Sequence, residues 1–134
     1  IAEAMAPLVP AGIDALAGLE LGGVPLAVML SQVTGVPTLF VRKKAKEYGT
    51  RRFAEGGEVS GKRLLVVEDV VTSGGQVVLS TRDLRLAGAL VERALCVIDR
   101  QAGGKEALAA EGVTLAALFG MAELKEAAGG RGGA

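Results

Sequence analysis

The feature that most constrains the fold is a series of wholly apolar, strand-like runs separated by helix-like segments. We expect strands at residues 14–19, 36–41, 62–69 and 93–99, while residues 112–119 fit either a fifth strand or the start of a helix. Helices are expected at 23–34 and 75–87, because Pro25 lies in the first turn of the former and a glycine follows each. Runs of this kind are typical of a parallel α/β sheet covered by helices on both faces.

The chain has 134 residues, half of them apolar, which suits one domain with a buried core. No apolar run reaches the roughly 18 residues that a membrane helix needs, and no stretch resembles a secretory signal. A net charge of zero argues against broad nucleic-acid binding. We therefore expect a cytoplasmic protein that binds neither nucleic acid nor membrane. Residues 1–128 form the expected domain, followed by a disordered Gly/Ala-rich tail at 129–134.

Histidine is absent from the chain, and Cys96 is its single cysteine. Without histidine, a Cys-His nucleophile pair or a zinc hydrolase is excluded within this chain. Cys96 lies in the apolar run ALCVI, so we interpret it as a small buried hydrophobic residue.

The stretch LLVVEDVVTSGG, residues 64–75, places two acids and a glycine loop after an apolar strand. Ligands of open α/β sheets bind beyond the carboxyl ends of the strands. The loop Thr72–Gly75 leads into a helix, and free amides at a helix start favour a phosphate. The carboxylates of Glu68 and Asp69 can accept hydrogen bonds from sugar hydroxyls or hold Mg²⁺. The pattern predicts a phosphorylated sugar; the alternative is a simple turn with helix-capping acids.

A basic loop forms the second candidate site. Residues 42–52 hold six of the fifteen basic residues, namely Arg42, Lys43, Lys44, Lys46, Arg51 and Arg52, together with the single tyrosine, Tyr48. The loop is either a solvated charged face or a lid that binds a multiply charged anion such as pyrophosphate. A phosphorylated sugar and a pyrophosphate group occur together in phosphoribosyl pyrophosphate (PRPP).

The stretch LLVVEDVVTSGG resembles the PRPP-binding signature of type I phosphoribosyltransferases. In addition, FVRKKAKEYG (40–49), IDRQAGG (98–104) and GLELGGVPLA (18–27) resemble the catalytic loop, the Asp-Arg-Gln segment and the pyrophosphate loop of orotate phosphoribosyltransferases. The resemblance implies a mostly parallel central sheet flanked by helices, with a long flexible catalytic loop. It also implies transfer of ribose-5-phosphate from PRPP to orotate, giving orotidine 5′-monophosphate and pyrophosphate in de novo pyrimidine synthesis.

The resemblance also implies roles for individual residues. Glu68 and Asp69 are expected to hold the ribose hydroxyls, and Arg100 the orotate carboxylate. The expected ribose and 5-phosphate site comprises Glu68, Asp69, Val70, Val71, Thr72, Ser73, Gly74, Gly75 and Gln76, with Thr72 also close to the base. The expected pyrophosphate site comprises Arg42, Lys43, Lys46, Tyr48, Leu21 and Gly22. Lys43, Lys46 and Asp69 are the expected catalytic residues. Mg²⁺ is expected to be held mainly by PRPP, near Glu68 and Asp69.

Two features depart from the family pattern. Some members carry a lysine where Leu21–Gly23 stands here. The family also has an N-terminal segment that caps the base pocket, and we expect this chain to lack it. The family also implies a homodimer whose basic loop reaches the neighbouring subunit. Two alternatives share the PRPP loop: a purine phosphoribosyltransferase, and a non-catalytic regulator that senses PRPP.

Overall fold

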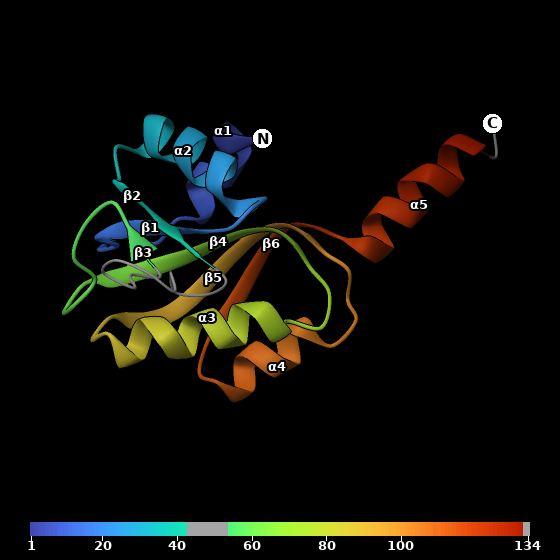
Figure 1. Ribbon diagram of the computed structural model, residues 1–134. Coiled ribbons are helices and arrows are strands. Elements are labelled where there is room, and N and C mark those ends of the chain that lie inside the picture. The colour runs from blue at the N-terminus through green and yellow to red at the C-terminus, as the bar shows by residue number, and fades with distance from the viewer. Residues whose placement is uncertain (43–53, 133–134) are drawn as a thin grey trace.

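A computed structural model describes residues 1–42 and 54–132, in which strands and helices alternate (Figure 1). In chain order the elements are α1 (Ala2–Met5), the 3₁₀ helix η1 (Ala6–Leu8), β1 (Ala15–Leu19), α2 (Gly23–Thr34), β2 (Thr38–Val41), β3 (Ala54–Glu55), β4 (Arg63–Val71), α3 (Gly75–Leu86), β5 (Leu90–Asp99), α4 (Gly104–Ala110), β6 (Thr114–Gly120) and α5 (Met121–Gly132). None of the helices within these residues has the length and apolarity that crossing a membrane requires.

The described strands form one sheet in the order β3–β2–β1–β4–β5–β6. The pairs β1–β2, β1–β4, β4–β5 and β5–β6 are parallel, and β3 is antiparallel to β2. Figure 1 shows α1 and α2 on one face, α3 and α4 on the other, and α5 extending away from the sheet. The predicted mostly parallel central sheet flanked by helices is confirmed.

The core has two halves because side chains of a strand alternate between the faces of the sheet. On β4, Leu64 and Val66 belong to the cluster that includes Val77 of α3. Leu65 and Val67 belong to the cluster that includes Leu30 of α2. All four β4 side chains are at most 1% exposed. Burial on both faces explains why the sequence shows a continuous apolar run instead of alternation.

Helix α2 has the bounds expected from its sequence signals. It ends at Thr34, and Gly35 adopts the left-handed conformation with φ 78°, where its amide donates to the Ser31 carbonyl at 2.8 Å. Only glycine adopts this conformation without steric cost, so Gly35 provides the stop. The helix predicted at 75–87 is likewise confirmed as α3, and residues 112–119 resolve to strand β6.

Several predicted boundaries were wrong. Strand β4 continues to Val71 instead of ending at Asp69, because Val70 and Val71 stay in register with Ile98 and Asp99 of β5. The short helices α1 and α4 were not expected, and neither was β3, which lies between the strands expected at 36–41 and 62–69. Residues 43–53 lie outside the described residues.

The expectation of a disordered tail from residue 129 is corrected by α5, which continues through Gly132. Its first part, MAELKEAA, consists almost entirely of strong helix formers, and helix propagation needs only one new hydrogen bond for each residue added. Residues 133–134 lie outside the described residues.

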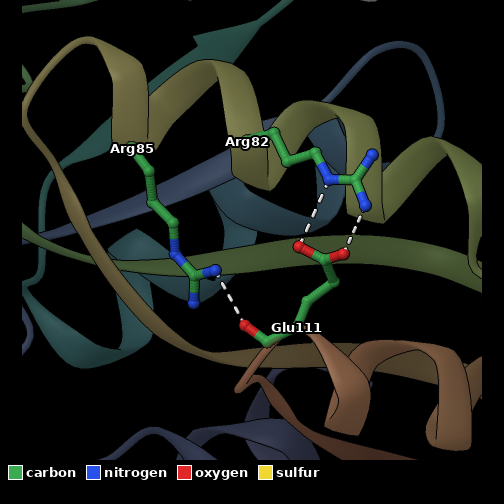
Figure 2. A network of polar contacts seen from close by, with 3 residues as sticks. All are labelled: Arg82, Arg85 and Glu111. Atoms are coloured by element: carbon green, nitrogen blue, oxygen red, sulfur yellow. Dashed lines mark hydrogen bonds and ion pairs between the residues drawn. The ribbon is translucent and has the colours of Figure 1, made fainter.

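An arginine–carboxylate network joins the carboxyl ends of α3 and α4 (Figure 2). Arg82 donates from Nε and Nη2 to the two carboxylate oxygens of Glu111. Arg85 donates to the Glu111 carbonyl at 2.7 Å and to the Val91 carbonyl of β5 at 2.6 Å. Because Glu111 caps the carboxyl end of α4, the bond from Arg85 to its carbonyl also satisfies the negative end of that helix.

We expect Glu111→Gln to lower Tm slightly at neutral pH. The hydrogen bond from Arg82 lowers the pKa of the Glu111 carboxyl. A carboxyl whose pKa is lower in the folded state stabilises the folded protein at pH values above its unfolded-state pKa. This contribution is lost as pH falls through the folded-state pKa. The Tm difference from the unmodified chain should therefore shrink as pH falls below the usual glutamate pKa of about 4.3.

Differential scanning calorimetry in steps from neutral to acidic pH measures this difference. Glu106→Gln, at an exposed position of the same helix, is the matched control. A Tm difference for Glu111→Gln that stayed constant across the pH range would contradict the assignment.

Candidate active site

The crossovers of the sheet place the candidate site at the carboxyl ends of β1 and β4. From β1 the chain passes through α2 to β2 on one side, and from β4 it passes through α3 to β5 on the other. The connections thus leave β1 and β4 in opposite directions, which makes a topological switch point where open α/β sheets bind ligands. Residues 20–22 and 72–74 lie at this point.

The two acids of β4 lie on opposite faces because their side chains alternate along the strand. Asp69 lies against Gly22: a Cβ added there would be 2.1 Å from Asp69 Oδ2. Asp69 is exposed, and its Oδ1 accepts from the Val70 amide at 2.8 Å. Glu68 Oε1 accepts from the Asp69 amide at 3.0 Å. The two acids are therefore neighbours in the chain near the carboxyl end of β4, with their side chains on opposite faces of the sheet.

The loop after β4 encloses a cavity of about 190 Å³, lined by Glu68 and by residues 70–77. The first amides of α3 have no carbonyl partner within the helix. The first helical hydrogen bond runs from the Val78 amide to the Gly74 carbonyl, at 2.9 Å. Gly74, which has φ 82°, and the exposed Gly75 both line the cavity. Because neither has a side chain, backbone atoms border this part of it. Such a helix start binds a phosphate group well.

Hydroxyl and amide side chains border this cavity. Ser73 and Thr72 are exposed, and Ser73 Oγ accepts from the Gly75 amide at 3.5 Å. Gln76 Nε2 donates to Ser80 Oγ at 3.1 Å, which turns the glutamine side chain along α3. Eight of the nine residues of the predicted ribose and 5-phosphate site line this cavity, and Asp69 does not.

The residues predicted to bind pyrophosphate fall into two groups. Leu21 and Gly22 lie in the loop after β1, where Leu21 is 79% exposed. Arg42 is partly buried and directly follows β2, so it lies at the same edge of the sheet. The remaining calls, Lys43, Lys46 and Tyr48, lie outside the described residues, as do the other basic residues of the loop, Lys44, Arg51 and Arg52.

Arg100 lies beside the loop after β4. Its amide donates to the Val71 carbonyl at 2.9 Å, which places the backbone of Arg100 next to Thr72, while its side chain is exposed. Sequence reasoning missed two residues that hold this segment, Asp99 and Gln101. Buried Asp99 accepts from the Gln101 amide at 2.8 Å, and Gln101 Oε1 accepts from the Ala122 amide at the start of α5, also at 2.8 Å.

The sequence carried a signal for Asp99, and the structure adds one for Gln101. An aspartate that ends an apolar strand is costly to bury unless it accepts hydrogen bonds. Gln101 also has a left-handed φ of 57°, which is uncommon for a residue with a side chain. Asp99 and Gln101, the polar residues on either side of Arg100, could therefore have been interpreted as residues that hold the Arg100 segment in place.

Cys96 lies in the core beneath the site, as predicted, and is fully buried. Burial raises the pKa of its thiol to about 12, and the nearby carboxylates of Asp99 and Glu68 add to the effect. The thiol is therefore protonated at neutral pH, so it does not act as a nucleophile here.

We expect Gly23→Ala to lower the free energy of unfolding by about 1–3 kcal/mol. A Cβ at Gly23 would lie 2.2 Å from the Val67 carbonyl oxygen, so α2 could no longer pack closely on β4. Urea denaturation measures the change. Gly129→Ala is the control, because Gly129 lies in α5 and its added Cβ would meet no atom within 4 Å. Equal stability of Gly23→Ala and the unmodified chain would contradict the packing argument.

The chain matches the phosphoribosyl transferase domain family over residues 3–116. It is 51% identical over 127 residues to the orotate phosphoribosyltransferase of Nocardioides sp., covering 95% of this chain and 71% of that one. It is 43% identical over 124 residues to that of Methanocella arvoryzae, covering 92% and 71%. The orotate phosphoribosyltransferase of Mycobacterium tuberculosis, solved with PRPP, superposes with a TM-score of 0.79 at 31% identity, covering 92% of this chain and 73% of that one.

These matches run through the strands and loops that build the switch point, from β1 to β6. Each match covers most of this chain and most of the relative's chain. The similarity therefore extends over the whole sheet and is not limited to one motif. The chain therefore belongs to the phosphoribosyl transferase family and, within it, to the orotate phosphoribosyltransferases.

Proposed function

We propose that this chain transfers ribose-5-phosphate from PRPP to N1 of orotate, giving orotidine 5′-monophosphate and pyrophosphate in de novo pyrimidine synthesis. Family membership supports the reaction class. The observation that carries the assignment to this site is the cavity at the start of α3, at the same sheet edge as the Asp69 carboxylate on Gly22. That arrangement suits a sugar with a phosphate at one end and charge developing at the other.

In the proposed complex, the 5-phosphate binds the amides and hydroxyls of residues 72–76, and Glu68 and Asp69 accept hydrogen bonds from the ribose hydroxyls. Pyrophosphate binds the loop Leu21–Gly22 together with Arg42, Lys43, Lys46 and Tyr48. The Arg100 guanidinium pairs with the orotate carboxylate, and Thr72 lies beside the base. The backbone contact between Arg100 and Val71 supports this last pairing, because it brings the base and phosphate ends of the site together.

The reaction needs no protein nucleophile. The bond from ribose C1 to the pyrophosphate oxygen breaks, and its electron pair leaves with pyrophosphate. N1 of orotate loses its proton to solvent and forms the new bond at C1. The sugar carries positive charge in the transition state, which the carboxylate of Asp69 favours, while Lys43 and Lys46 stabilise the departing anion. The protonated state of Cys96 is consistent with this scheme.

Mg²⁺ fits the donors at this edge of the sheet only together with the substrate. Among residues 1–42 and 54–132, no three His, Cys, Asp or Glu side chains gather into a metal site. Asp69 is exposed and offers the hard oxygen that Mg²⁺ prefers, and Mg²⁺ commonly binds through one carboxylate plus substrate phosphates. We propose that PRPP holds Mg²⁺ mainly through its own oxygens, near Asp69 and Glu68, where it would neutralise charge on the leaving group.

We also propose a homodimer whose basic loops reach the neighbouring site. Helix α2 supports it with an apolar surface, since Val28, Met29 and Val33 are 37%, 55% and 47% exposed. Mixing a Lys46→Ala variant with an Asp69→Asn variant tests the shared loop. Mixed dimers should regain activity that neither parent has, because one site would keep both residues. No recovery from a mixture of confirmed mixed dimers would contradict loop sharing.

The first test is pyrophosphate release from PRPP and Mg²⁺, measured with orotate, adenine, guanine or no base. The protein is expressed with any residues that its gene encodes before Ile1. Release only with orotate is the expected result. Release with a purine would identify a purine phosphoribosyltransferase instead. Binding of PRPP without release with any base would favour the regulator that senses PRPP.

A further inference from the structure

Gly104, the first residue of α4, packs directly on the loop after β4. It is buried, and a Cβ added there would lie 2.5 Å from Val71 Cγ1 and 2.8 Å from the Thr72 carbonyl oxygen. The same Cβ would be 3.4 Å from the Gly74 amide nitrogen. Seen from the other side, a Cβ on Gly74 would lie 3.1 Å from Gly104 Cα. The two backbones therefore touch with no side chain between them.

Space, and not backbone conformation, requires glycine at position 104. Gly103, just before it, has φ 95° but its added Cβ would meet no atom within 4 Å. Gly104 is helical and lies outside the positive-φ region, so alanine would suit its backbone. Only the contact with residues 71–74 excludes a methyl group there.

Helix α4 cannot easily retreat from such a methyl group, because it is tied at its far end. There Glu111 is held by Arg82 and Arg85 of α3 (Figure 2). The segment that leads into α4 is tied as well, through the bond from the Arg100 amide to the Val71 carbonyl. The exposed residues Thr72 and Ser73 are the least restrained partners in this contact. We therefore expect the loop, and not the helix, to move.

We infer that Gly104 is a positioning residue for the 5-phosphate: the close contact of α4 with residues 72–74 sets the shape of the phosphate-binding loop. The inference rests on the proposed function, since it takes that loop as the site of the 5-phosphate. Gly104 touches neither ribose nor pyrophosphate in this scheme. Its replacement should therefore affect one end of PRPP only.

The experiment is calorimetric titration of the unmodified chain, Gly104→Ala and Gly112→Ala with ribose 5-phosphate and, separately, with pyrophosphate and Mg²⁺. Gly104→Ala should weaken ribose 5-phosphate binding roughly tenfold or more and leave pyrophosphate binding unchanged. Gly112→Ala is the matched control, since it strains the other end of α4, where φ is 75°, far from the loop. It should lower Tm without changing either affinity.

Two results would overturn the inference alone. One is ribose 5-phosphate affinity that Gly104→Ala leaves intact, and the other is an equal loss of affinity for both ligands. Failure of the unmodified chain to bind ribose 5-phosphate would contradict the proposed function as well. If Gly104→Ala does not fold, the double variant with Val71→Ala removes the nearest atom but keeps the contact with the Thr72 carbonyl. Compared with Val71→Ala alone, it should still show the selective loss.

Discussion

Asp69→Asn is expected to lower kcat by about a hundredfold or more, with a smaller change in KM for PRPP. Asparagine keeps the shape of the side chain, and its oxygen can still accept from the Val70 amide as Asp69 Oδ1 does at 2.8 Å. The variant loses the negative charge beside Gly22, which in the proposed mechanism favours positive charge on the ribose. Because that charge develops only in the transition state, the loss should appear in kcat.

Steady-state kinetics with saturating orotate and Mg²⁺ measures this effect. Asp83→Asn is the matched control: Asp83 is an exposed carboxylate on α3, beyond the residues that line the cavity. Its replacement should leave kcat unchanged, and both variants should unfold at temperatures close to that of the unmodified chain. Full turnover by Asp69→Asn would remove the catalytic role assigned to this carboxylate.

Arg100→Gln is expected to raise KM for orotate roughly tenfold to a hundredfold, the range for losing hydrogen bonds to a charged group. KM for PRPP should stay unchanged. The Arg100 amide binds the Val71 carbonyl whatever the side chain, so the loop should keep its place. Lysine at this position should restore little, because a single ammonium group cannot reproduce the planar, bidentate contact of guanidinium with a carboxylate.

Arg93→Gln is the control for this experiment. Like Arg100, Arg93 is exposed, but it lies within β5, where it pairs with Leu65 near the start of the parallel strands and not at their carboxyl ends. Its replacement removes the same charge and should leave both KM values unchanged. An increase in KM for PRPP as large as that for orotate would show that Arg100 holds the site together instead of selecting the base.

Much of the fold could be predicted from the sequence because its signals are local. The continuous apolar run of β4 indicated burial on both faces, which the clusters around Leu64 and Leu65 confirm. Pro25 and Gly35 marked both ends of α2. The residues that line the cavity after β4, where we propose that the 5-phosphate binds, could also be singled out from the sequence, because they are nearly contiguous in the chain.

Boundaries that depend on partners could not be predicted in this way. Strand β4 extends past its acids because β5 offers hydrogen bonds as far as Asp99. Helix α4 has only seven residues, too few for a clear periodic pattern, and is held by the contacts of Gly104 and Glu111. Strand β3 has two residues and exists through its pairing with β2.

The sequence by itself determined the alternation of strands and helices, the mostly parallel sheet and the loop that can hold a phosphate, since each follows from residues close together in the chain. Only the tertiary structure decided what that loop faces. The order of the strands brings Asp69 against Gly22 and sets Gly104 on Gly74, and each pair is distant in sequence. These contacts depend on where the chain crosses the sheet, because local propensity carries no information about which strand ends meet.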